Sequence, residues 1–189
     1  DVITIGVSKI SVGGTLTGST EACKGVGFSE FNLVDYTGEL FTWQKSTSAL
    51  GPWSNLTETS NKLKIDNNGT SAYYRVQVKS GVCSSDNSNM IQHIIYDATI
   101  PGKIVGGGDV CENSNQGVLE LVGYKGTILD WEKQNATGAW EPLGFDGDLF
   151  WYEKLTESTA YRAIVQNGLC AVDYSKSETI TIHPEPVVG

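Results

Sequence analysis

Apolar and polar residues alternate along most of the chain in short runs, a pattern typical of half-buried β-strands. Residues 62–65 place Leu63 and Ile65 on one face and two lysines on the other. Turn residues separate such runs at intervals of about 8–12 residues, and no segment has the period of a helix. The pattern predicts an all-β fold, an antiparallel β-sandwich of about seven strands. The expected strands of the first sandwich are 15–23, 28–36, 40–45, 53–57, 62–65, 72–78 and 89–96.

The chain contains this arrangement twice. The run from Tyr74 to Cys83 recurs from Tyr161 to Cys170, and in both copies an alternating strand leads into a Ser-Gly or Asn-Gly turn. A period of nearly 90 residues is that of a whole small domain, so we predict two tandem copies of one domain. Further identities at the same period are Cys23 and Cys111, Gly38 and Gly126, Trp43 and Trp131, Lys45 and Lys133, Trp53 and Trp140, and Ser88 and Ser175.

The ends of the chain suggest where the copies begin. Residues 2–5 resemble residues 180–182, the last strand of the second copy, and Val-Gly recurs at 12–13, 105–106 and 188–189. We therefore expect residues 1–9 to be the end of a preceding repeat or a linker, 10–101 to be repeat 1 and 102–189 to be repeat 2. We expect the chain to be a piece of a longer series of repeats, in which Pro101 and Pro184 stiffen the connections between neighbouring repeats.

Charge narrows the range of partners. The chain has 22 acidic and 13 basic residues, a formal net charge of −9. Nucleic acids and anionic membranes need a positive face, so the balance argues against both as partners. No apolar run approaches the 18 residues that a membrane-spanning helix needs.

Each copy carries two cysteines, Cys23 and Cys83 in the first and Cys111 and Cys170 in the second. There is no C-x-x-C motif, which argues against a redox pair or a zinc knuckle. A disulfide within each copy is the simplest interpretation, and closing such a loop would contribute roughly 4 kcal/mol. It would place the protein in an oxidising compartment outside the cytoplasm. Free buried thiols and bridges between neighbouring copies are the alternatives, since sequence does not fix the pairing.

Five positions carry tryptophan, and four of them recur between the copies. Trp53 and Trp140 are expected at structural positions on edge strands. Residues that recur in the middle of strands are predicted to pack in the two cores: Trp43, Trp131, Tyr74 and Tyr161.

Trp151 has no counterpart in the first copy. Aligning Leu63 and Ile65 with Phe150 and Tyr152 places Trp151 opposite Lys64, on the outward face of its strand. An outward tryptophan is a candidate contact for a sugar ring or a protein partner. Partial burial under a loop and packing between repeats are the alternatives.

No residue pattern indicates catalysis or a bound cofactor. Gly-x-Ser-x-Gly, His-Glu-x-x-His and phosphate-binding glycine loops are absent from the sequence, so we predict a protein that is not an enzyme. Asp146-Gly147-Asp148 has carboxylates that can offer oxygen to Ca²⁺. An Asp-x-Asp pair alone lacks the further ligands that such a site requires, and we interpret it as a turn.

The order of motifs resembles a known family. A cysteine, a tryptophan about 20 residues later, a Tyr-Arg strand, a Gly-x-Cys turn and a closing strand such as Thr179–His183 occur once per copy. This order is similar to the immunoglobulin-like repeats of large Bacteroidota surface proteins, including gliding-motility adhesins and other type IX-secreted proteins. The resemblance implies tandem immunoglobulin-like domains at an extracellular, cell-surface location. The second cysteine lies beyond the tyrosine strand, unlike that of antibody domains.

Three functions are compatible with these patterns. The first is a non-catalytic adhesin fragment, whose repeats form an extended stalk or an adhesion surface in gliding motility. The second is a carbohydrate- or protein-binding module that acts through Trp151. The third is a pair of accessory domains of a secreted enzyme. Expected partners are neighbouring repeats of the same chain and a surface glycan or protein.

Overall fold

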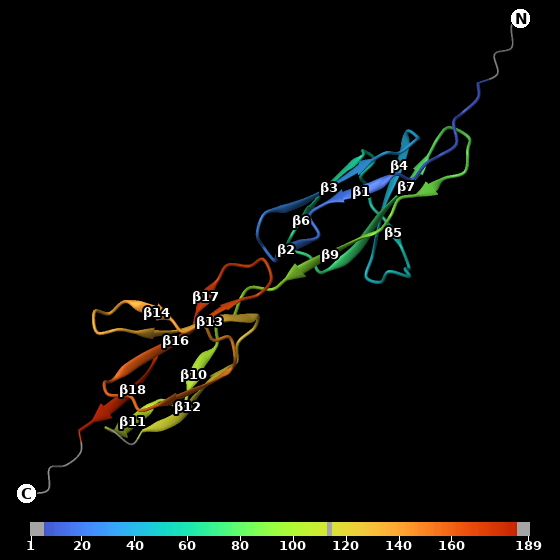
Figure 1. The fold of residues 1–189 in the computed structure, drawn as a ribbon. Helices are drawn as coiled ribbons and strands as arrows, with labels where there is room; N and C mark the ends of the chain where they lie inside the picture. The colour runs from blue at the N-terminus through green and yellow to red at the C-terminus, as the bar shows by residue number, and fades with distance from the viewer. Residues whose placement is uncertain (1–5, 113–114, 185–189) are drawn as a thin grey trace, which may run out of the picture. The chain divides into compact units, whose positions relative to one another are not determined.

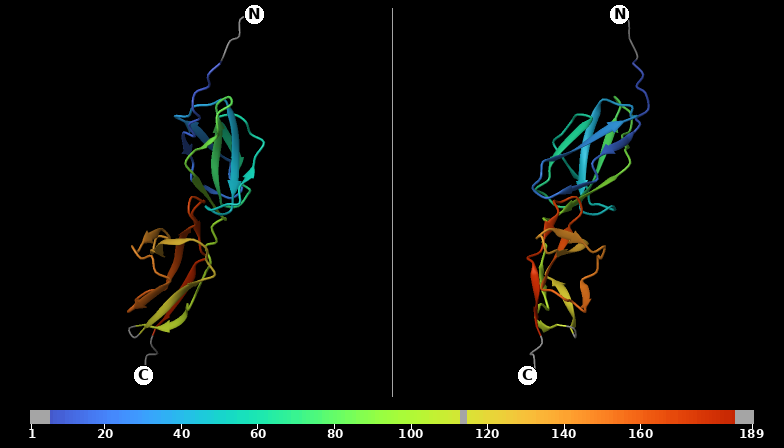
Figure 2. Two further views of the ribbon diagram at one scale, coloured as in Figure 1. Left: turned by 90° about the vertical axis from the view of Figure 1, so that its right-hand side faces the viewer. Right: turned by 60° about the vertical axis from the view of Figure 1, so that its left-hand side comes forward.

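The computed structural model describes residues 6–112 and 115–184, which contain strands and turns and no helix. The chain divides into two compact units, Asp1–Tyr96 and Asp97–Gly189. Strands β1 to β9 belong to the first unit and β10 to β18 to the second, and Figure 1 labels most of them. Further views show strand arrows and no coiled ribbon in either unit (Figure 2).

Unit 1 folds into two sheets. A small sheet has the order β1-β3-β6, and a six-stranded sheet has the order β2-β9-β7-β4-β5 with β8 paired to β7. The strands are β1 (Thr15–Gly18), β2 (Glu21–Cys23), β3 (Phe28–Val34), β4 (Leu40–Ser46), β5 (Ser54–Asn55), β6 (Lys62–Asp66), β7 (Ala72–Lys79), β8 (Asp86–Asn87) and β9 (Ile91–Tyr96).

Unit 2 repeats this plan with sheets β10-β12-β15 and β11-β18-β16-β13-β14, the latter with β17 paired to β16. The strands are β10 (Lys103–Val105), β11 (Gly108–Cys111), β12 (Gln116–Val122), β13 (Thr127–Gln134), β14 (Trp140–Pro142), β15 (Leu149–Glu153), β16 (Thr159–Gln166), β17 (Asp173–Tyr174) and β18 (Glu178–His183).

The first predicted strand, 15–23, is in fact two strands in different sheets. At Gly18, where the chain leaves the small sheet, φ is +143° and an added Cβ would lie 2.3 Å from the Glu30 carbonyl oxygen. Gly106 occupies the same place in unit 2, with φ of +97° and a Cβ position 2.3 Å from the Val118 carbonyl oxygen. Only glycine tolerates this approach. Beyond it, β2 and β11 pair in parallel with β9 and β18, so the larger sheets are not wholly antiparallel.

These equivalences correct the predicted starts of the copies. Gly106 corresponds to Gly18 and not to Gly13, so the Val-Gly match at 12–13 and 105–106 is wrong. Val12 forms a bridge with Thr37, and its true counterpart, Ile100, forms one with Lys125. The lead-in segment of unit 2 therefore begins at Asp97, before the expected join at Pro101–Gly102. The corresponding part of unit 1 includes Ser11, whose hydroxyl oxygen accepts a hydrogen bond from the backbone N–H of Ser80. The predicted matches at residues 2–5 and 188–189 lie outside the described residues.

Each core lies between the two sheets of its unit. In β7 and β16 every second side chain points inward, as the two-residue period of a strand requires. Trp43 and Trp131 are fully buried at the centre, and both indole N–H groups donate to a loop carbonyl, of Ser60 and Gly147, at 2.8 Å. The first core comprises Leu16, Phe31, Leu33, Trp43, Leu63, Ala72, Tyr74, Val76, Val78 and Ile91. The second comprises Ile104, Leu119, Leu121, Ile128, Trp131, Tyr152, Tyr161, Ala163, Val165 and Ile180.

One core position differs in chemistry between the copies. His93 in β9 is 1% exposed, and in β18 the corresponding buried residue is Ile180. The Nδ1 of His93 lies 3.0 Å from the carbonyl oxygen of Ser19, so Nδ1 carries the proton and donates it. Its Nε2 is buried without a partner among the described residues. Burial lowers the pKa of His93; hydrogen bonds to the backbone of Ser19 and Thr20 oppose this shift, and the charge of Lys45 adds to it.

We predict that His93→Ile stabilises unit 1 more at acidic pH than at neutral pH. Because the pKa of His93 is lower in the folded state, the unfolded state binds more protons once the pH falls below the unfolded value near 6.5. Stability is therefore lost as pH falls through that value, and isoleucine removes this dependence. The melting temperature of the wild-type chain and the variant should be followed between pH 7.5 and 5. His183→Ile, at an exposed position, is the control. Parallel pH profiles for the wild type and His93→Ile would contradict the prediction.

Candidate functional site

The outer face of the small sheet of unit 2 carries the exposed tryptophan. Trp151 lies in the middle of β15, an edge strand, with 73% of its surface exposed, and it pairs with Val118 of β12. Its orientation follows from the alternation in β15. Phe150 and Tyr152 point into the core, where the Phe150 ring stacks on Trp131 at 5.6 Å between centroids, so Trp151 must point outward.

A groove of about 400 Å³ runs beside this tryptophan at the open edge of the sheet. It is lined by Gln116, Gly117, Trp151, Tyr152 and Glu153. A Cβ on Gly117 would lie 2.4 Å from the Tyr152 hydroxyl oxygen, so glycine at this position leaves room for the tyrosine ring. The groove thus combines an aromatic face with an amide and a carboxylate, groups that suit a ligand with both apolar and hydroxyl surfaces.

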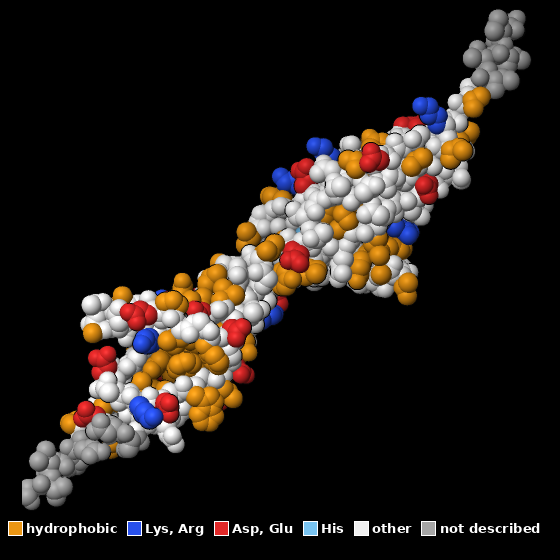
Figure 3. Space-filling view, viewed as in Figure 1, with side chains coloured by type: hydrophobic (Ala, Val, Ile, Leu, Met, Phe, Trp, Pro, Cys, Tyr) orange, Lys and Arg blue, Asp and Glu red, His pale blue; other side chains and the backbone are white. Residues whose placement is uncertain are grey.

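A second apolar side chain is exposed near the groove. Leu149, two residues before Trp151 and on the same face, is 44% exposed. Apolar side chains are visible on the surface of unit 2 among acidic and basic ones (Figure 3). Large exposed apolar side chains close together are a common feature of interaction surfaces.

The corresponding face of unit 1 has a different chemistry. Lys64 takes the place of Trp151: it pairs with Glu30, as Trp151 pairs with Val118. The Lys64 ammonium lies 4.4 Å from the centre of the Phe28 ring, so a cation covers the aromatic group on this face. The two cores differ at His93 and Ile180 but are otherwise built alike, whereas on this outer face a tryptophan takes the place of a lysine.

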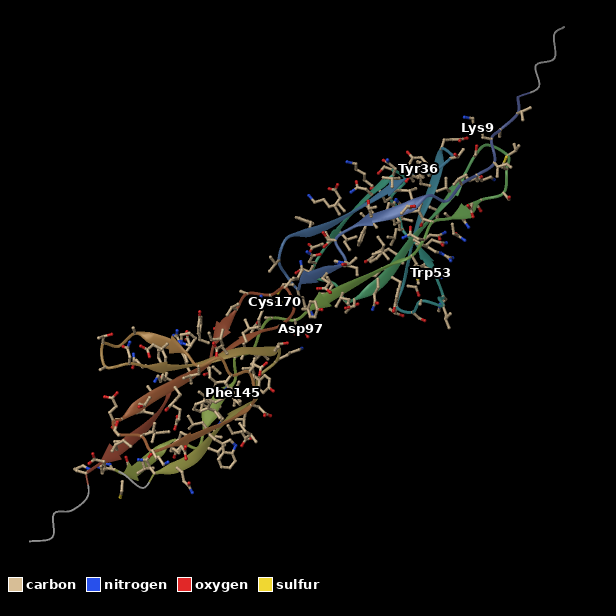
Figure 4. All side chains as sticks on the ribbon, in the orientation of Figure 1. Lys9, Tyr36, Trp53, Asp97, Phe145 and Cys170 are labelled. Carbon is tan, nitrogen blue, oxygen red and sulfur yellow. The ribbon has the colours of Figure 1, made fainter. Side chains whose placement is uncertain are left out.

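The recurrent tryptophans Trp53 and Trp140 lie on the outer face of the larger sheets, next to arginines. The guanidinium of Arg75 is 4.2 Å from the Trp53 ring centre, and that of Arg162 is 4.2 Å from Trp140. Trp53 is labelled in Figure 4, next to β5 of unit 1. Trp140 is the first residue of the edge strand β14. Both tryptophans thus stack on a cation at the sheet surface.

The arginine of the Tyr-Arg motif was not singled out from the sequence. Arg162 also stacks on Tyr174 at 4.3 Å, and its Nε donates to Glu132 at 2.6 Å. In unit 1 Arg75 donates instead to Gln44 at 2.7 Å. The signal was present, because the arginine and the tryptophan recur together, and planar guanidinium groups stack on aromatic rings.

The core tyrosines Tyr74 and Tyr161 are buried, and burial raises the pKa of both hydroxyls, so they remain neutral. Ser88 and Ser175, also recurrent, are buried. Each hydroxyl accepts from a backbone N–H of the tyrosine strand, of Val76 or Ala163, at 2.9 Å. The two serines therefore hold the segment that contains them to β7 or β16, and the two tyrosines pack in the cores.

The predicted pairing of cysteines within each copy is wrong. Cys83 and Cys111 are free thiols, whereas Cys23 and Cys170 are disulfide-bonded. The two cysteines of a copy cannot pair because they lie at opposite ends of its larger sheet. Cys23 is opposite Tyr96, at the end of β9, whereas Cys83 follows the far end of the antiparallel β7. An eight-residue strand spans roughly 25 Å, and disulfide-bonded cysteines have Cα atoms within about 7 Å.

The acidic turn at 146–148 has a structural role. The Gly147 carbonyl accepts the indole N–H of Trp131, and the Asp148 carbonyl accepts the backbone N–H of Leu121. Within residues 6–112 and 115–184, no three histidine, cysteine, aspartate or glutamate side chains gather as metal ligands. The described residues include no helix that is long and apolar enough to cross a membrane.

The chain belongs to a family described as a domain of unknown function (DUF8696), whose model matches it twice, at residues 12–96 and 100–184. No curated protein sequence matches the chain. The two matches and the two units confirm the tandem repetition.

Solved structures show the fold. A crystal structure of a mouse coronavirus receptor-binding domain with its murine receptor is similar with a TM-score of 0.63 at 9% identity, covering 89% of this chain and 100% of that chain. A marsupial T cell receptor gives a TM-score of 0.59 at 10% identity, covering 92% of this chain and 73% of that chain. The structure called Rst D1-D2 gives 0.52 at 13% identity, with coverage of 90% and 100%. The predicted all-β fold of immunoglobulin-like sandwiches is confirmed.

We predict that Trp151→Ala changes the free energy of unfolding by no more than about 0.5 kcal/mol, as is usual for exposed positions. Trp131→Ala should instead cost about 3–5 kcal/mol, because it empties the core. Chemical denaturation of both variants measures the difference. A loss of several kcal/mol for Trp151→Ala would show that this ring supports the fold.

We also predict that the native chain has two thiols that react with an alkylating agent and two that react only after reduction. Peptide mass spectrometry should find Cys83 and Cys111 in the first group. Breaking the one disulfide should lower the melting temperature, because a covalent constraint on the unfolded state is lost. Four reactive thiols in native material would contradict the assignment.

Proposed function

We propose that the chain is a non-catalytic, extracellular interaction module, in which serial immunoglobulin-like repeats lengthen a cell-surface adhesin and the second repeat contacts a ligand through Trp151. The observation that carries this proposal is the contrast between the copies. Their cores are built alike, yet at equivalent positions one outer face exposes a tryptophan and the other a lysine. A side chain that is 73% exposed contributes little to folding, so contact with another molecule accounts for it best.

The extracellular location is supported by the disulfide-bonded cysteines, since disulfides persist in oxidising compartments. The immunoglobulin-like fold is a frequent scaffold for surface recognition, although fold alone assigns no ligand. A Bacteroidota adhesin that is exported by type IX secretion and acts in gliding motility is the specific form of this proposal, and it rests on the sequence resemblance.

The ligand class that the groove favours is a carbohydrate. Trp151 offers a flat apolar face to a sugar ring, and Gln116 and Glu153, which line the same groove, can form hydrogen bonds with its hydroxyl groups. The formal charge of −9 favours a neutral glycan over a polyanionic one. A protein partner is the second candidate, favoured by the exposed Leu149 on the same face. The residues that line the groove give no specific support to the third hypothesis, that the repeats are accessory domains of a secreted enzyme.

We predict that the chain binds a neutral glycan and that Trp151→Ala weakens this binding roughly 30-fold or more, as expected for loss of a central aromatic contact. A glycan array identifies the ligand, and calorimetry with that glycan measures the loss. The matched control is Phe28→Ala, which removes an exposed ring from the equivalent face of unit 1 and should leave affinity unchanged. Equal losses for both variants, or no glycan binding at all, would contradict a carbohydrate site at Trp151.

The surface location has its own test. Antibodies against the repeats should label intact cells that express the parent protein, and external protease should remove the label. Labelling only after lysis would contradict the extracellular role. This result is independent of the ligand.

A further inference from the structure

The small sheet of unit 2 ends at β15, which has a neighbouring strand on one side only among the described residues. Two hydrogen bonds fix which of its backbone groups face that neighbour, β12. At one end of the ladder the N–H of Leu121 donates to the Asp148 carbonyl at 2.8 Å. At the other end the N–H of Lys154 donates to the Asn115 carbonyl at 2.9 Å. Hydrogen-bonded residues recur at every second position of an antiparallel strand, so the even-numbered residues of β15 bond to β12.

The odd-numbered residues of β15 face the open edge of the sheet. Leu149, Trp151 and Glu153 therefore direct their backbone N–H and C=O groups away from β12. The side chains of the same three residues are exposed on the outer face. Backbone groups at the open edge of a sheet are a template on which another strand can pair.

The equivalent edge strand of unit 1, β6, carries charges at these positions. The N–H of Leu33 in β3 donates to the Asn61 carbonyl at 2.8 Å, so the odd-numbered residues of β6 bond to β3. The residues that face the open edge of β6 are then Lys62, Lys64 and Asp66. Lysine on an edge strand opposes pairing with another strand, and a symmetric pair of β6 strands would set Lys64 against Lys64 of a second copy. The strand β15 has no lysine and lacks this protection.

The strand β15 is complementary to itself in the antiparallel direction. Two such strands, related by a twofold axis at Trp151, would place the two Trp151 rings side by side, a cross-strand aromatic pair that stabilises a sheet. Leu149 would lie beside Glu153 of the second copy, so the two glutamates stay apart. The exposed residues that flank the strand, Asp148 and Lys154, have opposite charges and would face each other at both ends of the contact.

We propose that two copies of this chain dimerise through β15, whose strands pair antiparallel and join the two small sheets into one. The contact uses the same surface on both copies, so it closes on itself and produces a dimer. Because the paired strands are short, the dimer is weak and forms as the concentration rises. This association goes beyond the proposed glycan contact: strand pairing uses the backbone of Trp151, and a sugar stacks on the face of its ring.

The oligomeric state of the full chain tests this interface. Sedimentation velocity without glycan should show a dimer whose fraction increases with concentration. Trp151→Lys gives β15 the residue that β6 has at this position and should leave the chain monomeric. Because unit 1 folds with lysine there, the variant should keep the wild-type melting temperature.

Two substitutions at Leu149 separate backbone pairing from side-chain contact. Proline has no N–H, and the N–H lost at Leu149 is one that faces the open edge, at the first residue of the strand, where proline is tolerated. Leu149→Pro should raise the dissociation constant of the dimer roughly 10-fold or more, and Leu149→Ala, which keeps the N–H, by less than about 3-fold. Equal losses for the two variants would contradict pairing through the backbone.

The charges that flank β15 allow a rescue experiment. Lys154→Asp sets two carboxylates against each other at both ends of the contact and should weaken the dimer. Lys154 has a φ of +51°, a conformation that aspartate also adopts, so the backbone is compatible with this substitution. Adding Asp148→Lys restores the opposite charges and should return the dissociation constant to the wild-type value. A double variant as weak as Lys154→Asp alone would contradict the register.

Amide hydrogen exchange locates the contact. As the concentration rises, the N–H groups of Leu149, Trp151 and Glu153 should exchange more slowly, and those of Lys62 and Lys64 should not change. A chain that stays monomeric at every concentration, or a dimer that Trp151→Lys leaves intact, would overturn the inference. Glycan binding is measured at dilutions where the chain is monomeric, so a failure here is distinguishable from a failure of the proposed function.

Discussion

The fold of each repeat depends on one buried indole between two sheets. Trp43 and Trp131 fill the centre of their sandwiches, and each donates its N–H to a carbonyl of the loop that precedes or enters the edge strand of the small sheet. A buried N–H without an acceptor would cost about 1–3 kcal/mol, so the loop is fixed by the same residue that fills the core. In unit 2 that loop leads directly into β15, and the Phe150 ring stacks on Trp131. The core therefore also sets which way Trp151 points.

The two copies show what a duplicated domain keeps and what it changes. The inward positions keep their apolar character, because cavities and unpaired polar groups inside a small domain are costly. His93 is the exception, a polar residue where the second copy has Ile180, and it leaves one ring nitrogen without a partner among the described residues. The outer faces carry no such constraint. There a tryptophan in one copy and a lysine in the other are equally compatible with folding, so this is where recognition can differ between repeats.

The cysteines behave neither like the inward positions, which keep their character in both copies, nor like the outer positions, which change. Their positions recur, yet each copy has one bonded and one free. The geometry of a disulfide is strict, and the two cysteines of one copy lie at opposite ends of the same sheet. A cross-link within a repeat is thereby excluded by the strand directions alone.

The sequence by itself determined the all-strand class, the tandem repetition, the inward tryptophans and the outward direction of Trp151. All of these follow from the two-residue period of strands and from self-similarity, which are local properties of the chain. Only the tertiary structure decided the split of residues 15–23 between two sheets, the start of the second repeat before Pro101, the arginine stacks and which cysteines are bonded or free. These depend on which strands become neighbours and at which end, because hydrogen-bond partners and disulfide distances join residues that are far apart in sequence.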